Sequence, residues 1–353
     1  MRLMTKRKKQ KRLENFIDKL KDGEIDYKPK VDGESGLDWS KYDKAQVNEL
    51  KDMLKFVKNS VDEAVERSGF DEDSDDTRGR PSYPPEDLAK GVLLQQYFEV
   101  SNRVAAGFVD LFSEKLGIEE AYSYKTLERA YDNPEVAMIL REVFEMSQEP
   151  VEDEETMFSP DGTGIPNSMK DNWEKTAYGD EGSNEFTKMI AMMGATYQFI
   201  SSVDFPNNPH AHESPYFQSL LEETASNYTQ IDLVSGDAAY LSRENCELIR
   251  SCGATPRLYP KKGITLKRGG CWAWGEMLFS FMEDPQEWLE EYHSRSNVES
   301  GFSNFKRNFL APLRKCIFRR RKTEAFARAC DYNLKRACYV RRQEGMTAPW
   351  MFD

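Results

Sequence analysis

The chain has 353 residues, of which 39% are hydrophobic and 12% aromatic, so it is long enough for two domains and has the composition of a globular protein. Its most apolar stretch, Met189–Ile200, is interrupted by polar residues and is too short to span a bilayer. No apolar segment follows the basic N-terminus. We therefore expect no membrane span, no signal peptide and an intracellular protein.

The cysteines and histidines narrow the choice of metal ligands. The six cysteines include no pair with the two-residue gap of a zinc knuckle or redox motif, and we expect them to be buried free thiols. Only three histidines are present. Carboxylates are therefore the expected ligands of any metal ion, and they suit hard cations such as Mg²⁺.

Charge is distributed unevenly along the chain, although the net charge is −12. Residues 1–12 hold seven Lys or Arg and no acidic residue, and residues 292–342 hold fourteen Lys or Arg against three acidic residues. The segment between them is strongly acidic. Two basic ends favour binding to a polyanion, because binding depends on the local field rather than on the total charge; a solvated basic tail is the alternative.

The N-terminal part is predicted to contain one helix between two irregular segments. We interpret residues 1–43, which begin with the basic run Lys6–Arg12, as a mobile arm. Apolar residues recur at helical spacing over 44–67 and predict an amphipathic helix, which either packs within its own domain or forms a dimer contact. The acidic run Asp71–Asp76 and the residues after it are typical of a linker, which ends this region at about residue 78.

Residues 79–150 are predicted to form an all-helical domain. Proline near a first turn and Ser or Asn before it mark the helix starts. The predicted helices span residues 84–98, 101–116, 124–131 and 133–146. Short helices joined by tight turns are typical of a helix-turn-helix bundle, and Lys125 and Arg129, four residues apart on the third helix, are candidates for contacts with DNA phosphates.

From residue 151 to residue 342 the pattern changes to alternating strands and helices. The predicted strands span residues 156–159, 188–193, 196–203, 231–235 and 255–259, and the predicted helices span residues 214–226, 243–251, 287–310 and 323–342. This order predicts a mixed α/β layer fold, with Asp161 and Asp237 at the carboxyl ends of strands. The last residues, 343–353, form a tail.

The helix predicted over 287–310 carries a polar stripe beside an apolar one. Tyr292, Arg295, Glu299 and Lys306 fall within an arc of roughly 60° on a helical projection. A carboxylate at the edge of a core can hold a metal ion, and the flanking cations can hold phosphate. The alternative is an ordinary amphipathic helix with an Arg295–Glu299 ion pair.

Asp161 and Asp237 make the metal hypothesis stronger. Each follows apolar strand residues and is surrounded by small neighbours such as Gly162 and Gly236, which allow a phosphate backbone to approach closely. Three carboxylates brought together repel one another unless cations bind, which is the logic of a two-metal site for phosphoryl transfer. With Glu299, these residues are our candidate catalytic and metal-binding residues.

Other carboxylates compete for this role, namely Asp171, Asp180, Asp204 and Asp232. Asp232 lies at the opposite end of the strand that precedes Asp237, so its side chain should point away from the site. Asp171 and Asp180 lie in a polar stretch that we interpret as a loop.

These motifs together resemble those of insertion-sequence DDE transposases. Tyr292-x2-Arg295-x3-Glu299-x6-Lys306 is similar at every position to their Y-R-E-K signature. Asp161-Gly-Thr-Gly and the segment Gly236-Asp-Ala-Ala-Tyr240 resemble the surroundings of their two aspartates, and residues 256–263 resemble the stretch that follows. Gly79–Glu86 is similar to the start of their N-terminal helical domain, so the resemblance covers about residues 79–342.

The resemblance implies a ribonuclease H-like catalytic core in which Asp161, Asp237 and Glu299 bind two Mg²⁺ or Mn²⁺ ions. It implies hydrolysis at the ends of an element and attack of the 3′-hydroxyl on target DNA. The phosphate-gripping residues would be Tyr292, Arg295 and Lys306, and Lys261 and Lys262 in the segment after the second aspartate are further candidates for DNA contacts.

Only 61 residues separate Asp237 from Glu299, so any insertion in the core is small and spans about residues 263–285. Trp272 and Trp274 within it either pack in the core or stack on an unpaired base. We expect the protein to act as a homodimer on two element ends, in the cytoplasm at the nucleoid. The alternatives are a ribonuclease H-like nuclease or resolvase, and a DNA-binding protein that descends from a transposase and has lost catalysis.

Overall fold

The computed structural model describes residues 5–25, 38–69, 83–167, 186–309 and 311–352. The helices are α1 (Lys6–Lys21), α2 (Trp39–Ser68), α3 (Pro85–Tyr97), α4 (Asn102–Leu116), α5 (Tyr124–Ala130), α6 (Pro134–Met146), α8 (Phe217–Asn227), α9 (Arg243–Ser251), α10 (Trp272–Glu283), α11 (Pro285–Tyr292), α12 (Arg295–Asn308) and α13 (Phe318–Gln343). The strands are β1 (Met157–Pro166), β2 (Phe186–Gly194), β3 (Ile200–Asp204), β4 (Leu233–Gly236) and β5 (Thr255–Leu258).

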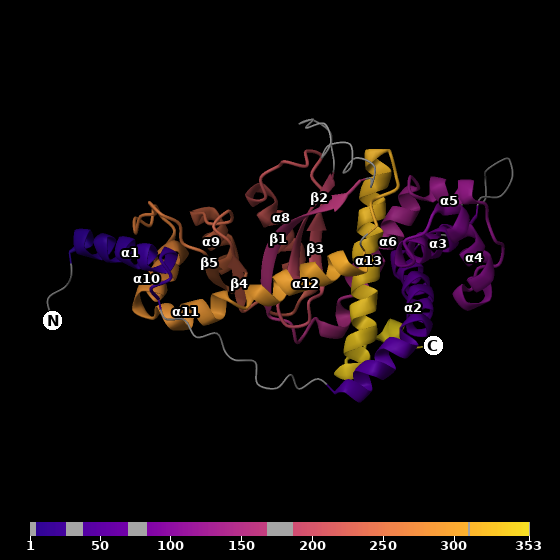
Figure 1. Cartoon of the computed structure of the whole chain (residues 1–353), viewed down its shortest axis with the longest axis horizontal. Coiled ribbons are helices and arrows are strands. Elements are labelled where there is room, and N and C mark those ends of the chain that lie inside the picture. Colours follow the sequence, from indigo (N-terminus) through magenta and orange to yellow (C-terminus); the bar gives the residue numbers. More distant parts are fainter. Residues whose placement is uncertain (1–4, 26–37, 70–82, 168–185, 310, 353) are drawn as a thin grey trace.

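The five strands form one mixed sheet in the order β3-β2-β1-β4-β5. β1, β2 and β3 are antiparallel neighbours, whereas β4 and β5 run parallel to β1. This is the sheet expected of a ribonuclease H-like core, so the predicted fold class is confirmed. In Figure 1 the sheet lies between α1 and α9–α11 on one side and α13 with α2–α6 on the other.

Helix α12 crosses the sheet and packs on β1 and β2. Residues 189–193 of β2 are fully buried, as expected of a strand covered on both faces. Val298, Phe302 and Phe305 form the buried face of α12. A β-carbon at Gly301 would lie 2.3 Å from the sulfur of Met193, so only glycine allows this close approach of helix and strand. The close approach fixes the height of α12 above β1 and β2.

Helices α2, α3 and α6 pack around α13. Helix α13 contacts α2, α3 and α6 as well as β3, and it joins the helical region to the sheet. Phe56, Val57 and Val61 of α2 are buried in this region. Helix α2 therefore packs within the chain, but mostly on α13, α6 and α3 rather than within residues 1–78. The helices predicted between residues 84 and 146 are all present within one or two residues.

Several segments differ from the sequence-based expectation, among them α1 and the region of α11 and α12. Lys6–Lys21, expected in a mobile arm, forms helix α1, which packs on α10 through Leu13 and Ile17. The single helix predicted over 287–310 is divided into α11 and α12 by a turn at residues 293–294. Of the six cysteines, four are buried as free thiols, but Cys316 is exposed and Cys252 is partly buried.

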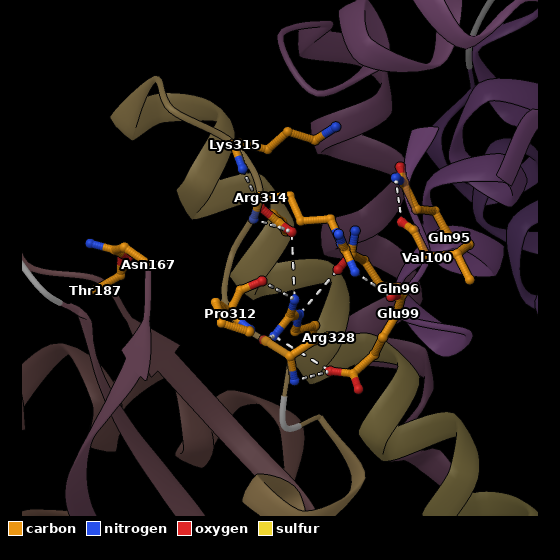
Figure 2. Close-up of polar contacts among 12 residues, drawn as sticks. Gln95, Gln96, Glu99, Val100, Asn167, Thr187, Pro312, Arg314, Lys315 and Arg328 are labelled. Atoms are coloured by element: carbon orange, nitrogen blue, oxygen red, sulfur yellow. Dashed lines mark hydrogen bonds and ion pairs between the residues drawn. The ribbon is translucent and has the colours of Figure 1, made fainter. Parts of the chain in front are cut away.

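A buried polar cluster holds the segment after α12 against α3 and α13 (Figure 2). We call it the polar joint; it comprises Gln96, Glu99, Glu324, Arg328 and the backbone of residues 311–315. Arg328 is 1% exposed and donates from Nε to Gln96 Oε1 at 3.0 Å and from Nη1 to the carbonyl of residue 311 at 2.5 Å. Glu324 accepts backbone N–H groups of residues 314 and 315 at 2.9–3.0 Å. The joint therefore ties the C-terminal end of α12 to two other helices.

Candidate active site

Asp161 and Asp237 lie on adjacent strands of the sheet or directly after them. Asp161 is opposite Ala191 of β2 in the middle of β1, so the prediction that β1 ends at residue 159 and that Asp161 follows it is wrong. The strand continues because β2 pairs along its whole length, whereas its pairing with β4 covers only residues 157–158. Asp237 directly follows β4 as predicted, and its Oδ1 accepts the N–H of residue 239 at 2.7 Å.

Arg295 connects Asp161 with Glu299. Its Nη1 lies 2.5 Å from Glu299 Oε1, one turn further along α12, and its Nη2 lies 3.8 Å from Asp161 Oδ1 on β1. The Glu299 side chain is 54% exposed and that of Arg295 is 16% exposed. The ion pair within the helix, which was the alternative to a metal-binding role for Glu299, therefore exists, and the same guanidinium also reaches the sheet. Within the described chain, Arg295 Nε is buried without a hydrogen-bond partner.

Nearby charges act on the partly buried Asp161. Burial raises the pKa of Asp161, and the negative charges of Glu213 and Asp237 raise it further, whereas Arg295 lowers it. Asp161 and Asp237 therefore lie close enough to repel each other. Arg295, whose guanidinium faces Asp161, offsets part of this repulsion.

The donor chemistry of the three predicted ligands fits Mg²⁺ or Mn²⁺, because all are carboxylates. Among the described residues, however, no group of three or more His, Cys, Asp or Glu is arranged so as to hold an ion. Glu299 instead forms an ion pair with Arg295 on the same helix.

Sequence reasoning missed a fourth carboxylate beside Asp161. A β-carbon on Gly162 would lie 2.1 Å from Glu213 Oε1, so Glu213 occupies the space above this glycine. Tyr240 donates its hydroxyl to Glu213 Oε2 at 2.8 Å, and Lys188 Nζ lies 3.0 Å from Oε1. The signal in the sequence was the glycine after Asp161, but the partner that needs the space lies about fifty residues away in the chain.

Tyr292 and Lys306 take different positions relative to Glu299. Tyr292 ends α11 and is buried, stacked on Trp288 with ring centroids 5.5 Å apart. Its hydroxyl lies beside the Arg295 guanidinium, and burial raises its pKa to about 12. Lys306 is exposed on α12. Because the turn at residues 293–294 separates Tyr292 from α12, the helical projection that placed all four signature residues on one stripe is wrong for Tyr292.

The remaining predicted DNA contacts lie on three surfaces. Lys261 Nζ is 3.5 Å from the carbonyl of residue 238, next to Asp237. Lys262 Nζ is 3.9 Å from Asp18 on α1. Lys125 and Arg129 are exposed on α5, at the far end of the molecule in Figure 1.

The structure describes two of the four competing carboxylates, Asp204 and Asp232. Asp232 is exposed before β4, at the opposite end of the strand from Asp237, as expected. Asp204 ends the edge strand β3 and is opposite Ile190 of β2. Asp171 and Asp180 lie outside the described residues.

The two tryptophans of the predicted insertion differ in how far they are buried. Trp274 is buried and donates its indole N–H to the carbonyl of Thr265 at 2.8 Å, which agrees with core packing. Trp272 is 66% exposed, so core packing is wrong for it. Both lie on α10, which packs on α9, α11 and β5.

Comparison with known proteins decides the family. A model of the transposase DDE domain matches residues 154–334, which cover the whole sheet and the three carboxylates. The chain belongs to the transposase DDE domain family. A second model, described as a transposase domain (DUF772), matches residues 42–109 of this transposase.

The transposase also resembles a curated protein. It is 27% identical over 261 residues to a probable transposase for insertion sequence element ISA1214 from Archaeoglobus fulgidus, a match that covers 72% of this chain and 76% of the relative. The resemblance to insertion-sequence DDE transposases is thereby confirmed. No helix in the described ranges is long and apolar enough to cross a membrane.

Proposed function

We propose that this transposase cleaves the DNA ends of an insertion element and joins them to target DNA at a two-metal site formed by Asp161, Asp237 and Glu299. The observation that carries the proposal is the match of the transposase DDE domain to residues 154–334, which include all three carboxylates, together with the positions of Asp161 and Asp237 on or directly after the neighbouring strands β1 and β4. Carboxylates are the hard oxygen ligands that suit divalent ions such as Mg²⁺.

In this proposal the carboxylates bind the metal ions and Arg295 binds a DNA phosphate. Asp161 and Asp237 present carboxylates from neighbouring strands, and Glu299 completes the set from α12 once it leaves Arg295. When bound, two Mg²⁺ or Mn²⁺ ions activate the attacking oxygen and stabilise the leaving oxygen. Released from Glu299, Arg295 can donate to a phosphate oxygen in the same place, where its Nε has no other partner.

Two phosphoryl transfers follow from this arrangement. In the first, a water oxygen attacks the phosphorus at the element end, the bond to the 3′-oxygen breaks and that oxygen takes a proton. In the second, the new 3′-hydroxyl attacks a phosphorus of target DNA and displaces the target's own 3′-oxygen. Two ends must be processed, so we propose that the protein acts as a homodimer on nucleoid DNA.

The test is metal-dependent cleavage of a duplex that carries the element's terminal repeat. Asp161→Asn, Asp237→Asn and Glu299→Gln should each reduce cleavage by about a thousandfold or more, because metal stabilisation of a transition state is worth several kcal/mol. Asp232→Asn is the matched control, because this exposed carboxylate precedes the same strand, and it should cleave at the wild-type rate. A triad variant that cleaves normally would remove that residue from the site.

The same assay separates the alternatives. A nuclease or resolvase would cut the duplex but would not join the cut end to a second DNA molecule. A protein that only binds DNA would show binding without cleavage in the wild type.

A further inference from the structure

A groove lies between α1 and the loop before α10, at the end of the molecule away from the helical region (Figure 1). Its volume is about 690 Å³. The residues lining it include five cations and no acidic residue: Lys6, Arg7, Lys9, Lys267 and Arg268. In the part of the chain that the structure describes, none of these five forms an ion pair, in contrast to Lys262 nearby, which pairs with Asp18.

The two walls of the groove are held together by specific contacts. The side-chain amide of Gln10 donates to the carbonyl of Ile264 at 2.9 Å and accepts the N–H of Leu266 at 2.9 Å. Arg12 donates to the carbonyl of Met282 at 3.0 Å. With Leu13 buried against α10, these contacts fix the position of α1 along the loop. The groove is therefore a built feature of the fold.

The loop is also held from its other side. Arg243 Nη2 donates to the carbonyl of Lys267 at 2.9 Å, and the Trp274 indole donates to the carbonyl of Thr265. Arg268 lies over the exposed ring of Trp272, with its guanidinium 3.9 Å from the ring centroid. The backbone of the loop and one of its cations are thereby ordered before any ligand binds, which lowers the entropy cost of binding.

We propose that this groove binds the sugar–phosphate backbone of DNA, as a second DNA contact separate from the site at Asp161. Unpaired cations on ordered walls attract a polyanion strongly, because no internal carboxylate competes for them. The contact places DNA at the α10 end of the sheet, opposite the helical region (Figure 1). This inference rests on the proposed function, in that DNA is taken as the polyanion.

The experiment compares two triple variants of the full chain with equal loss of charge. The groove variant is Lys6→Gln, Lys9→Gln and Lys267→Gln. The control variant is Lys8→Gln, Lys11→Gln and Lys19→Gln, whose lysines are on α1 but do not line the groove. Binding of a fluorescently labelled duplex is measured against salt concentration, and thermal melting checks that both variants fold.

The groove variant should lower the slope of log K against log salt by about 0.9 for each lost phosphate contact, and by up to about 2.7 in all, whereas the control variant should keep the wild-type slope. Equal slopes for the two variants would overturn the proposal that the groove binds DNA. Cleavage by the wild type that depends on Asp161 would then still support the proposed function. Conversely, a slope change confined to the groove variant supports DNA binding in the groove even if cleavage does not depend on Asp161.

Discussion

Arg295 and Arg328 are both paired with carboxylates, but their surroundings differ. Arg328, in the polar joint, is 1% exposed, and each of its three guanidinium nitrogens has a hydrogen-bond partner. Arg295 retains an unpartnered Nε, and its partner Glu299 is 54% exposed. A saturated, buried pair is costly to break, whereas an open pair can exchange one partner for another at little cost. The comparison indicates a structural role for Arg328 and is consistent with the DNA-binding role proposed for Arg295.

The largest effect expected to separate the two arginines is on the free energy of unfolding. Arg328→Met leaves the buried carboxylate of Glu324 without its guanidinium partner, and we expect the free energy of unfolding to fall by about 3–5 kcal/mol. Arg295→Met breaks a pair with an exposed carboxylate, and we expect a loss of no more than about 1 kcal/mol. Urea unfolding of the full chain measures both. Equal losses would show that the two arginines do not differ in the way their burial indicates.

A second substitution tests the reason for the loss at Arg328. Adding Glu324→Gln to Arg328→Met removes the uncompensated charge, so part of the lost stability should return. An additive loss in the double variant would indicate that packing rather than charge holds the polar joint.

The next effect is on catalysis at Arg295. Arg295→Met should reduce cleavage of a pre-nicked end by roughly 10- to 150-fold, because hydrogen bonds to charged groups contribute about 1.5–3 kcal/mol. Arg295→Lys should restore only part of the rate, because an ammonium cannot make a bidentate contact. Full activity of Arg295→Met at saturating DNA would contradict a role in holding phosphate.

The smallest effect is expected at Lys306, which is exposed on α12. Lys306→Ala should weaken binding of cleavage-site DNA by roughly threefold to tenfold, the value of one ordinary hydrogen bond. The metal concentration needed for half-maximal cleavage should stay unchanged, because a cation does not bind metal. A higher metal requirement with unchanged DNA affinity would contradict the phosphate-gripping role.

The sequence predicted local features well where one segment carried the signal. Pro85 and Pro134 near helix starts and Asn133 as a cap located the N-terminal helices, and the Asn133 side chain does accept the N–H of residue 135, whereas Ser101 makes no such cap bond at α4. The alternation of strands and helices was sufficient to predict the fold class. The position of Arg295 four residues before Glu299 predicted their ion pair.

The sequence could not show contacts between distant segments. The amphipathic pattern of residues 6–21 was hidden by eight Lys or Arg residues, so α1 was expected to be an arm until its packing on α10 was visible. The pairing of β2 with β1 from Phe158 to Pro166, which extends β1 through Asp161, joins residues 20 (Pro166 and Phe186) to 36 (Phe158 and Gly194) positions apart. Glu213 and the polar joint are assembled in the same way from several elements.

A calorimetric measurement of Mn²⁺ binding to the DNA-free protein most directly tests the central claim, that the three carboxylates hold metal ions. Asp161, Asp237 and Glu299 are proposed to hold the ions. Arg295 pairs with Glu299 and so competes with the metal ions for this carboxylate. Asp161→Asn should therefore lose Mn²⁺ binding, whereas Arg295→Gln, which frees Glu299, should bind Mn²⁺ more tightly than the wild type. Unchanged Mn²⁺ affinity in Asp161→Asn would contradict the account.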